Sequence, residues 1–258
     1  MPLNEPIDFA AARRDGCLIG FSEGRGKKTR FSDEEKTAIE AGVKKAVRAV
    51  RRRIKFDYVS IIISIGEGQN NLLIPVEGGS GMFSVTLDFD RKFPVYNSPK
   101  QQNYITGVVA HEIHHQLRKE TKEFRSLDFY DLRQAFTMEG LALAFDELVV
   151  GRLPPIVAAV PHSYIRDKEP WVKDNLSVEI DDGLGEFEAD HGLPDSFTYC
   201  FAYSLAKAWI NYSKRSAAQA LHTPASQIID PWLERKFSVA DGIPKDFLAQ
   251  LAWLPPQP

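Results

Sequence analysis

The sequence has little cysteine, little net charge and no long apolar run. Its 258 residues include two cysteines, Cys17 and Cys200, which lie far apart and form no CxxC pair. This predicts neither a disulfide framework nor a cysteine zinc site. Lysine plus arginine (32) nearly balances aspartate plus glutamate (35), and the net charge of −3 predicts no nucleic-acid partner and no anionic membrane surface. The most apolar segments, 59–65 and 141–150, are too short or too interrupted by charge to cross a membrane.

The first residues, MPLNEPIDFAAARRDG, also lack the apolar stretch of a signal peptide, and they carry acids and two arginines. Together with the scarcity of cysteine, this predicts a cytoplasmic protein in a reducing compartment. The chain does have 43% hydrophobic residues, which is ample material for a packed core. We therefore predict a globular protein.

Local patterns predict helices and strands in the first part of the chain and mainly helices afterwards. Ser32 and Glu35 have the form of a capping box, and apolar residues at helical spacing follow from Ile39 to Ile54. Two segments predict strands, 58–65 (YVSIIISI) and 83–89 (FSVTLDF). Further helices are expected near 101–118, near 124–150 before Gly151, and near 197–214, with a flexible GGSG at 78–81 and an internal loop at 183–194.

These patterns indicate an α+β fold with a small mixed or antiparallel sheet and a mainly helical C-terminal part. We expect a single domain over 1–258, with an α/β sub-lobe at 1–118 and a helical sub-lobe at 119–258. The expected helix near 101–118 ends the first sub-lobe, and it carries the most informative motif of the chain.

That motif is the stretch AHEIHHQLR, in which His111, Glu112 and His115 satisfy HExxH. On an α-helix, residues four apart lie on one face with Cβ atoms about 5–6 Å apart, so both imidazoles can reach one metal ion. Glu112 is turned by about 100° from His111, which lets its carboxylate reach a water on the open side of that ion. The spacing predicts His111 and His115 as zinc ligands and Glu112 as the general base.

His114 also lies within one helical turn of His111, but choosing it as a ligand would leave His115 unexplained. We assign His114 to packing or to support of the ligands. The alternative to a metal site is a polar helix in the core. Burying three imidazoles and a carboxylate together is costly without a cation, and this cost favours zinc.

A catalytic zinc site usually has three protein ligands and an open position, so a third ligand must come from elsewhere. The extended pattern HExxHxxGxxH is absent, because Arg118 and Thr121 occupy its last two positions. Glu139 lies inside an apolar helical segment, where a carboxylate needs a counter-charge. Its small neighbours Gly140 and Ala142 would let that helix approach the first closely. We predict Glu139 as the third ligand.

Amide hydrolysis also needs a hydrogen-bond donor for the oxyanion, and the candidates are Tyr203, Tyr199 and His191. Tyr199 and Tyr203 lie four residues apart on one helix face, and we select Tyr203 as the donor. Arg118 has two readings, orientation of a carboxylate ligand or a surface ion pair. Glu147 is expected to be a solvated acid.

The motifs resemble those of a known family. HEIHHQLR, with EGLA beginning 24 residues after His115, is similar to the HExHHxxR and EGLA motifs of the predicted zinc-dependent protease family of bacteria, a gluzincin-like group. The stretch 192–210 resembles the tyrosine-bearing helix of that family, which usually shows a GYxxGY-like pattern. It departs from the pattern at Thr198 and Ala202, where glycines are common. The resemblance spans about 84–229.

The resemblance implies a zincin-like fold of the gluzincin type, with zinc on His111, His115 and Glu139 and with Glu112 as the catalytic residue. Zinc would lower the pKa of a bound water, and Glu112 would accept its proton during attack on a peptide carbonyl. We therefore expect a zinc metallopeptidase with a peptide or protein substrate, laid along the strand 83–89 as an added strand.

Two other functions stay open at this point. The chain could be a zinc-containing binding or scaffold protein without turnover, although Glu112 would then have no purpose. It could also be a zinc amidohydrolase that acts on a non-peptide amide. The absence of a GxMEN-like signature argues mildly against an aminopeptidase.

Overall fold

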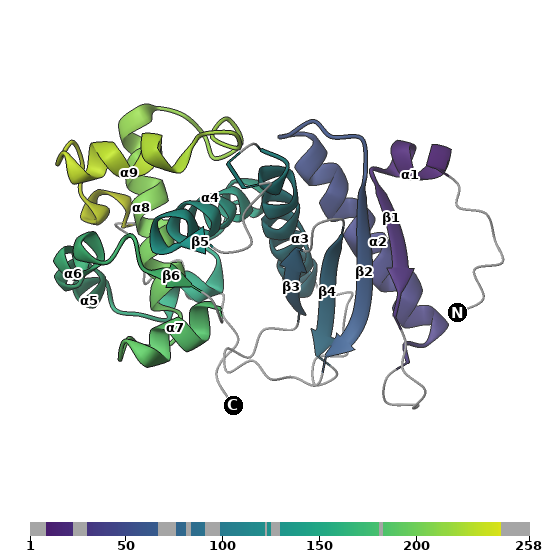
Figure 1. Ribbon diagram of the computed structural model, residues 1–258. Helices are drawn as coiled ribbons and strands as arrows, with labels where there is room; N and C mark the ends of the chain where they lie inside the picture. The colour runs from purple at the N-terminus through teal and green to yellow at the C-terminus, as the bar shows by residue number, and fades with distance from the viewer. Residues whose placement is uncertain are drawn as a thin grey trace. The chain divides into compact units, whose positions relative to one another are not determined.

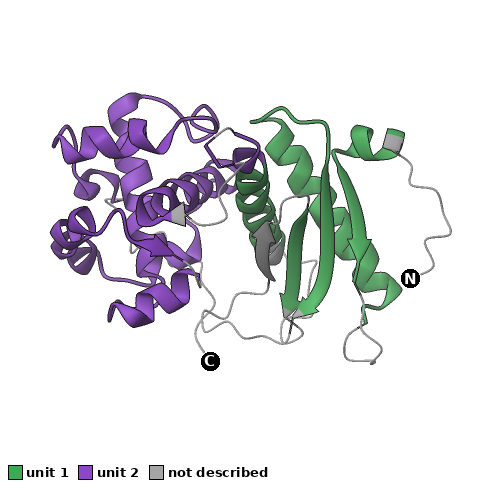
Figure 2. Cartoon of the chain, viewed as in Figure 1, with its two compact units in different colours: residues 1–116 green, residues 117–258 purple. Residues whose placement is uncertain are grey.

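The computed structural model describes residues 9–22, 30–66, 76–80, 84–90, 99–121, 123–124, 130–180 and 183–243. Two compact units divide the chain, residues 1–116 and 117–258 (Figure 2). The helix α3 begins in the first unit, and its last turn belongs to the second. The described residues form a mixture of helices and a small mixed sheet, which is compatible with the predicted α+β class (Figure 1). In chain order the elements are α1 (Phe9–Asp15), β1 (Cys17–Phe21), α2 (Asp33–Arg51), β2 (Val59–Gly66), β3 (Val76–Ser80), β4 (Val85–Asp90), α3 (Pro99–Lys119), β5 (Tyr130–Asp131), α4 (Leu132–Val150), η2 (Pro155–Ala158), α5 (His162–Asp167), α6 (Glu169–Asp174), β6 (Glu179–Ile180), α7 (Leu184–Asp190), α8 (Phe197–Ser213), α9 (Ala225–Leu233) and η3 (Val239–Gly242).

The first unit contains a four-stranded sheet in the order β1-β2-β4-β3. β1 and β2 are parallel, β2 and β4 are parallel, and β3 is antiparallel to β4. In β2 and β4 the side chains alternate between buried apolar residues and more exposed ones, as the period of two along a strand requires. The buried set is Val59, Ile61, Ile63, Val85, Leu87 and Phe89.

The helix α2 begins where the capping box predicts. The Ser32 hydroxyl accepts from the Glu35 amide at 3.1 Å, and the Glu35 carboxylate accepts from the Ser32 amide at 2.7 Å. One face of α2 buries its apolar residues, and in Figure 1 the helix runs along one face of the sheet. The predicted amphipathic helix is therefore confirmed.

Two predictions about the sheet are wrong. The expected strand 83–89 is β4, whose first residue is Val85 (Phe83 lies outside the described residues), and β4 pairs with β2 on one side and β3 on the other. It is an internal strand, so it cannot receive a substrate strand at its edge. The supposedly flexible glycines at 78–79 belong to β3, since their backbone groups pair with β4 and no side chain is needed for that ladder. β3 is the last strand of the described sheet.

The helix α4 starts later than predicted. The structure has Tyr130 and Asp131 in the short strand β5, and residues 125–129 lie outside its described part. Asp131 caps α4, because its carboxylate accepts from the Gln134 amide at 2.9 Å. The helix ends as predicted, with Gly151 in the left-handed conformation at φ 75°.

The second unit is built on α4 and α8, which cross at a glycine. A Cβ atom added to Gly140 would lie 2.2 Å from the Ala202 carbonyl oxygen and 3.0 Å from the Ala206 Cβ atom. Gly140 therefore lets the backbone of α4 touch that of α8. We expected Gly140 to allow a close approach between α4 and the HExxH helix. The close approach is instead between α4 and α8.

We predict that Gly140→Ala lowers the free energy of unfolding by about 1–3 kcal/mol, because the new methyl group overlaps a backbone carbonyl that cannot move aside easily. The matched control is Gly185→Ala in α7, where an added Cβ meets nothing within 4 Å. That change should be neutral or stabilising by about 0.5–1 kcal/mol, since alanine favours helix. Urea unfolding of both variants measures the difference, and equal stabilities would show that the crossing tolerates a larger residue.

The region 183–194 is not a plain loop, because it contains α7. Glu188 of α7 is buried, and its carboxylate accepts from the amides of Ser196 at 2.8 Å and Thr198 at 2.6 Å. These two hydrogen bonds satisfy backbone N–H groups at the start of α8. Ser196 itself has a φ of 68° and makes no side-chain cap bond. Burial raises the pKa of Glu188, and the two residues that bond to it oppose the rise.

Both cysteines are free and buried. Across the described ranges, no helix combines the length and the apolar character that a membrane crossing requires.

Candidate metal centre

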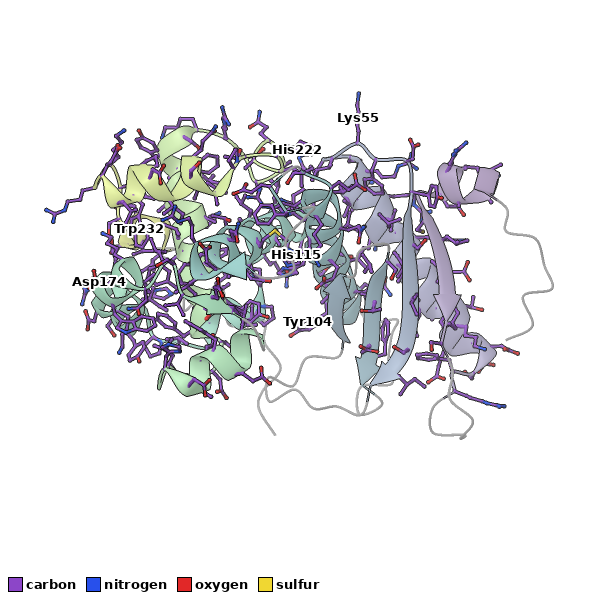
Figure 3. All side chains as sticks on the ribbon, in the orientation of Figure 1. Lys55, Tyr104, His115, Asp174, His222 and Trp232 are labelled. Atoms are coloured by element: carbon purple, nitrogen blue, oxygen red, sulfur yellow. The ribbon has the colours of Figure 1, made fainter. Side chains whose placement is uncertain are left out.

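The helix α3 presents His111 and His115 on one face. Their Nε2 atoms lie 2.8 Å apart, and the two rings are perpendicular with centroids 4.4 Å apart. Two N–H groups cannot donate to each other, so at least one of these Nε2 atoms carries no proton. Figure 3 labels His115 on this helix. The pair therefore offers at least one lone pair at the point where the two rings meet.

The structure brings Glu139 of α4 to the same place. One Nε2 or Nδ1 atom of each histidine and one carboxylate oxygen of Glu139 all lie within 4.8 Å of one another. Two nitrogens bound to a tetrahedral zinc at 2.0–2.1 Å are about 3.3 Å apart, so small side-chain rotations would bring all three donors to bonding distance. Two imidazoles and a carboxylate are also the donor types of a catalytic zinc site. The residues fit a zinc ion.

Glu112 follows His111 on α3 and is 6% exposed. In the described part of the chain, no hydrogen bond or ion pair engages its carboxylate. A general base needs this freedom, because it must take a proton from a water molecule. Glu112 is also outside the group formed by His111, His115 and Glu139, as the 100° helical turn requires.

His114 is fully buried on α3 and does not belong to the metal-binding group. This position is compatible with both roles expected of it, packing and support of the ligands.

Arg118 takes neither of its two expected roles. Its side chain is fully buried, which excludes a surface ion pair. Its guanidinium donates to the carbonyl oxygens of Leu221 at 2.9 Å and Thr223 at 2.8 Å, and it lies 4.7 Å from the centroid of the Phe124 ring. Burial lowers the pKa of Arg118 to about 10, and the Glu123 carboxylate opposes that shift. The group stays charged at neutral pH.

Tyr203 is held by α4. Its hydroxyl donates to Glu147 Oε2 at 2.9 Å, and Lys207 Nζ lies 2.6 Å from the same oxygen. Burial raises the pKa of Tyr203, and the charge of Glu147 raises it further. The phenol is therefore a neutral donor whose only proton is engaged. Glu147 is correspondingly a paired residue and not the solvated acid expected from its position.

Tyr199 and His191 occupy different surroundings. Tyr199 lies one turn before Tyr203 and packs with it against the apolar cluster that contains Leu143. His191 is exposed at the end of α7, and its Nδ1 is 2.9 Å from the Phe187 carbonyl oxygen. This is the loop position that its sequence surroundings suggest.

Comparison with known proteins adds one finding. A family model described as "predicted Zn-dependent protease" matches residues 39–230. This range contains the HExxH helix, Glu139 and the tyrosine-bearing helix, and the match confirms the resemblance to this family. No curated protein and no solved structure matches the chain.

Proposed function

Because this chain belongs to the predicted Zn-dependent protease family, we propose that it is a metallopeptidase of the gluzincin type, with zinc bound by His111, His115 and Glu139. The family is zinc-dependent, and a protease family implies a peptide or protein substrate. The proposal includes a zincin-like arrangement of the mixed sheet and the HExxH helix.

One observation carries the proposal. The donor atoms of two histidines on α3 and of a glutamate on α4 lie within 4.8 Å of one another, although Glu139 follows His115 by 24 residues. Two imidazoles and a carboxylate that converge in this way form the donor set of a catalytic zinc site. The three residues leave further coordination positions for a water and a substrate, as in a catalytic site.

Each residue then has a role in hydrolysis. A zinc ion held by these three residues would polarise a water molecule and the scissile carbonyl. Glu112 accepts the proton of the attacking water and passes it to the leaving amine. His111, His115 and Glu139 would hold the ion, and Glu112 follows His111 on the same helix.

The donor to the oxyanion remains a prediction among Tyr203, Tyr199 and His191. Tyr203 would have to release Glu147 before it could donate to the substrate. Lys207 would keep Glu147 paired after that release, since both contact the same oxygen. If the substrate binds as an added strand, it must use β1 or β3 in place of β4, because these two strands are the edges of the described sheet.

The alternatives are a zinc-containing scaffold and an amidohydrolase for non-peptide amides. A structural zinc site usually closes all four positions with protein ligands, and it has no use for a free carboxylate such as Glu112. The uncommitted state of Glu112 therefore favours an enzyme. The family favours peptides over other amides.

The proposal is tested on the wild-type chain by elemental analysis and by digestion of a random peptide library. We expect about one zinc ion per chain, and cleavage that stops with a chelator and returns with added zinc. No zinc after reconstitution would overturn the metal site. Zinc without cleavage of any peptide would favour the scaffold or the non-peptide amide.

A further inference from the structure

We propose that Arg118 is a positioning residue that sets the rotation of α3, and with it the approach of His111 and His115 to zinc, by clamping the connection between α8 and α9. This connection comprises residues 214–224. The inference rests on the proposed zinc site, and it concerns how this chain holds the two histidines in register.

The clamp consists of backbone contacts. Arg118 Nη1 donates to the Leu221 carbonyl at 2.9 Å and lies 3.5 Å from the Ala220 carbonyl, while Nη2 donates to the Thr223 carbonyl at 2.8 Å. One planar guanidinium thus contacts three carbonyl groups of one connection. The fork of N–H groups on arginine can bond to several carbonyls at once, which the single ammonium of lysine does less well.

A second contact joins the start of α9 to the segment that follows α3. The Glu123 carboxylate accepts from the Ala225 amide at 3.1 and 3.2 Å, and Ala225 is the first residue of α9. The Phe124 ring lies against the Arg118 guanidinium. Arg118 and Glu123 therefore both bond to residues 220–225, and Phe124 packs against Arg118.

Stability alone does not account for a buried arginine at this position. Arg118 is fully buried, and among the residues that the structure describes no carboxylate forms an ion pair with it. Removing such a charge from water is costly, and apolar residues of similar volume are often as stabilising as buried charged groups. The hydrogen bonds of Arg118 have a fixed direction, so they can set the rotation of α3, which apolar packing would leave free. This role explains why a buried arginine is present despite its cost.

The orientation in question is that of the two histidines. Arg118 follows His111 and His115 by seven and three residues, so all three side chains lie on one face of α3. A rotation of this helix by only 5° would move a ligand atom 6 Å from the axis by about 0.5 Å. Metal–ligand distances tolerate about 0.2 Å. A clamp one turn beyond His115 therefore acts directly on the geometry of the ligands.

The clamp is tested by measuring zinc affinity in competition with a chromophoric chelator. Circular dichroism checks that each variant is folded. We expect Arg118→Met to bind zinc about 10–100-fold more weakly and Arg118→Lys to fall between it and the wild type. The matched control is Arg215→Lys, an exposed arginine in the same connection, which should not change the affinity. Unchanged affinity in folded Arg118→Met would overturn the inference.

A measurement on the wild type covers the case in which the Arg118 variants do not fold. Coupling between two sites is reciprocal, so if the clamp favours zinc binding, zinc must also tighten the clamp. Hydrogen exchange of the amides in 217–225 should slow severalfold on zinc loading. Zinc binding with no change in this exchange overturns the role of Arg118 and leaves the proposed function intact. Absence of zinc binding overturns both.

Discussion

Glu112→Gln is expected to keep about one zinc ion per chain and to lose about 10²- to 10⁴-fold in kcat/KM for peptide cleavage. The amide of glutamine is close to the carboxylate in size, so the buried position on α3 should accept it without a change in fold. It cannot take a proton from water, and the step that depends on Glu112 is lost. The measurement is zinc content by elemental analysis together with cleavage of a peptide found in the library digestion.

The control for this variant is Glu186→Gln, which removes an exposed carboxylate in α7 and should change neither zinc content nor rate. A scaffold protein gives a different pattern, in which Glu112→Gln retains zinc and any partner binding and there is no turnover to lose. Full cleavage activity in Glu112→Gln would remove the assigned general base and would require another group to accept the proton.

His115→Ala and Glu139→Ala are expected to weaken zinc binding by more than about 100-fold, since even residues that only support metal ligands contribute 10–100-fold. Each substitution removes one of three donors, and two remaining donors hold the ion poorly. Zinc content after dialysis measures the loss, with circular dichroism to show that each variant is folded. Peptide cleavage should disappear together with the zinc.

His222→Ala is the matched histidine control, because His222 is exposed in the connection between α8 and α9 and contributes no donor to the metal-binding group (Figure 3). It should bind zinc as the wild type does. Zinc retained in folded Glu139→Ala would transfer the third ligand to another residue, while His111 and His115 would keep their roles. Zinc retained in folded His115→Ala would contradict the HExxH assignment itself.

Some features of the chain follow from short-range patterns. The capping box at Ser32, the alternation in β4 and the left-handed Gly151 all involve residues a few positions apart, and the structure contains each of them. The same holds for the i, i+4 relation of His111 and His115, since any α-helix over this stretch places both on one face. Backbone geometry is sufficient to predict such relations.

Other predictions from short-range patterns are wrong, because pairing with a distant segment decides the local structure. The glycines of β3 suggest flexibility, but pairing with β4 makes them a strand. The same pairing turns β4 from a possible edge into an internal strand. Residues 130–131 continue a helical pattern, yet they pair with β6, and the helix starts only after Asp131. A local pattern contains no information about the partner strand that decides these cases.

The sequence by itself determined that His111, Glu112 and His115 share one helix, and its motifs indicated the family that the family model confirms. Only the tertiary structure decided which groups meet the side chains of this region. In the folded chain Glu139 lies close to the two histidines, and Arg118 donates to the carbonyls of 220–223. The Tyr203 hydroxyl donates to Glu147. These contacts join residues from 24 to more than 100 positions apart, and they form because packing of an apolar core brings distant helices together.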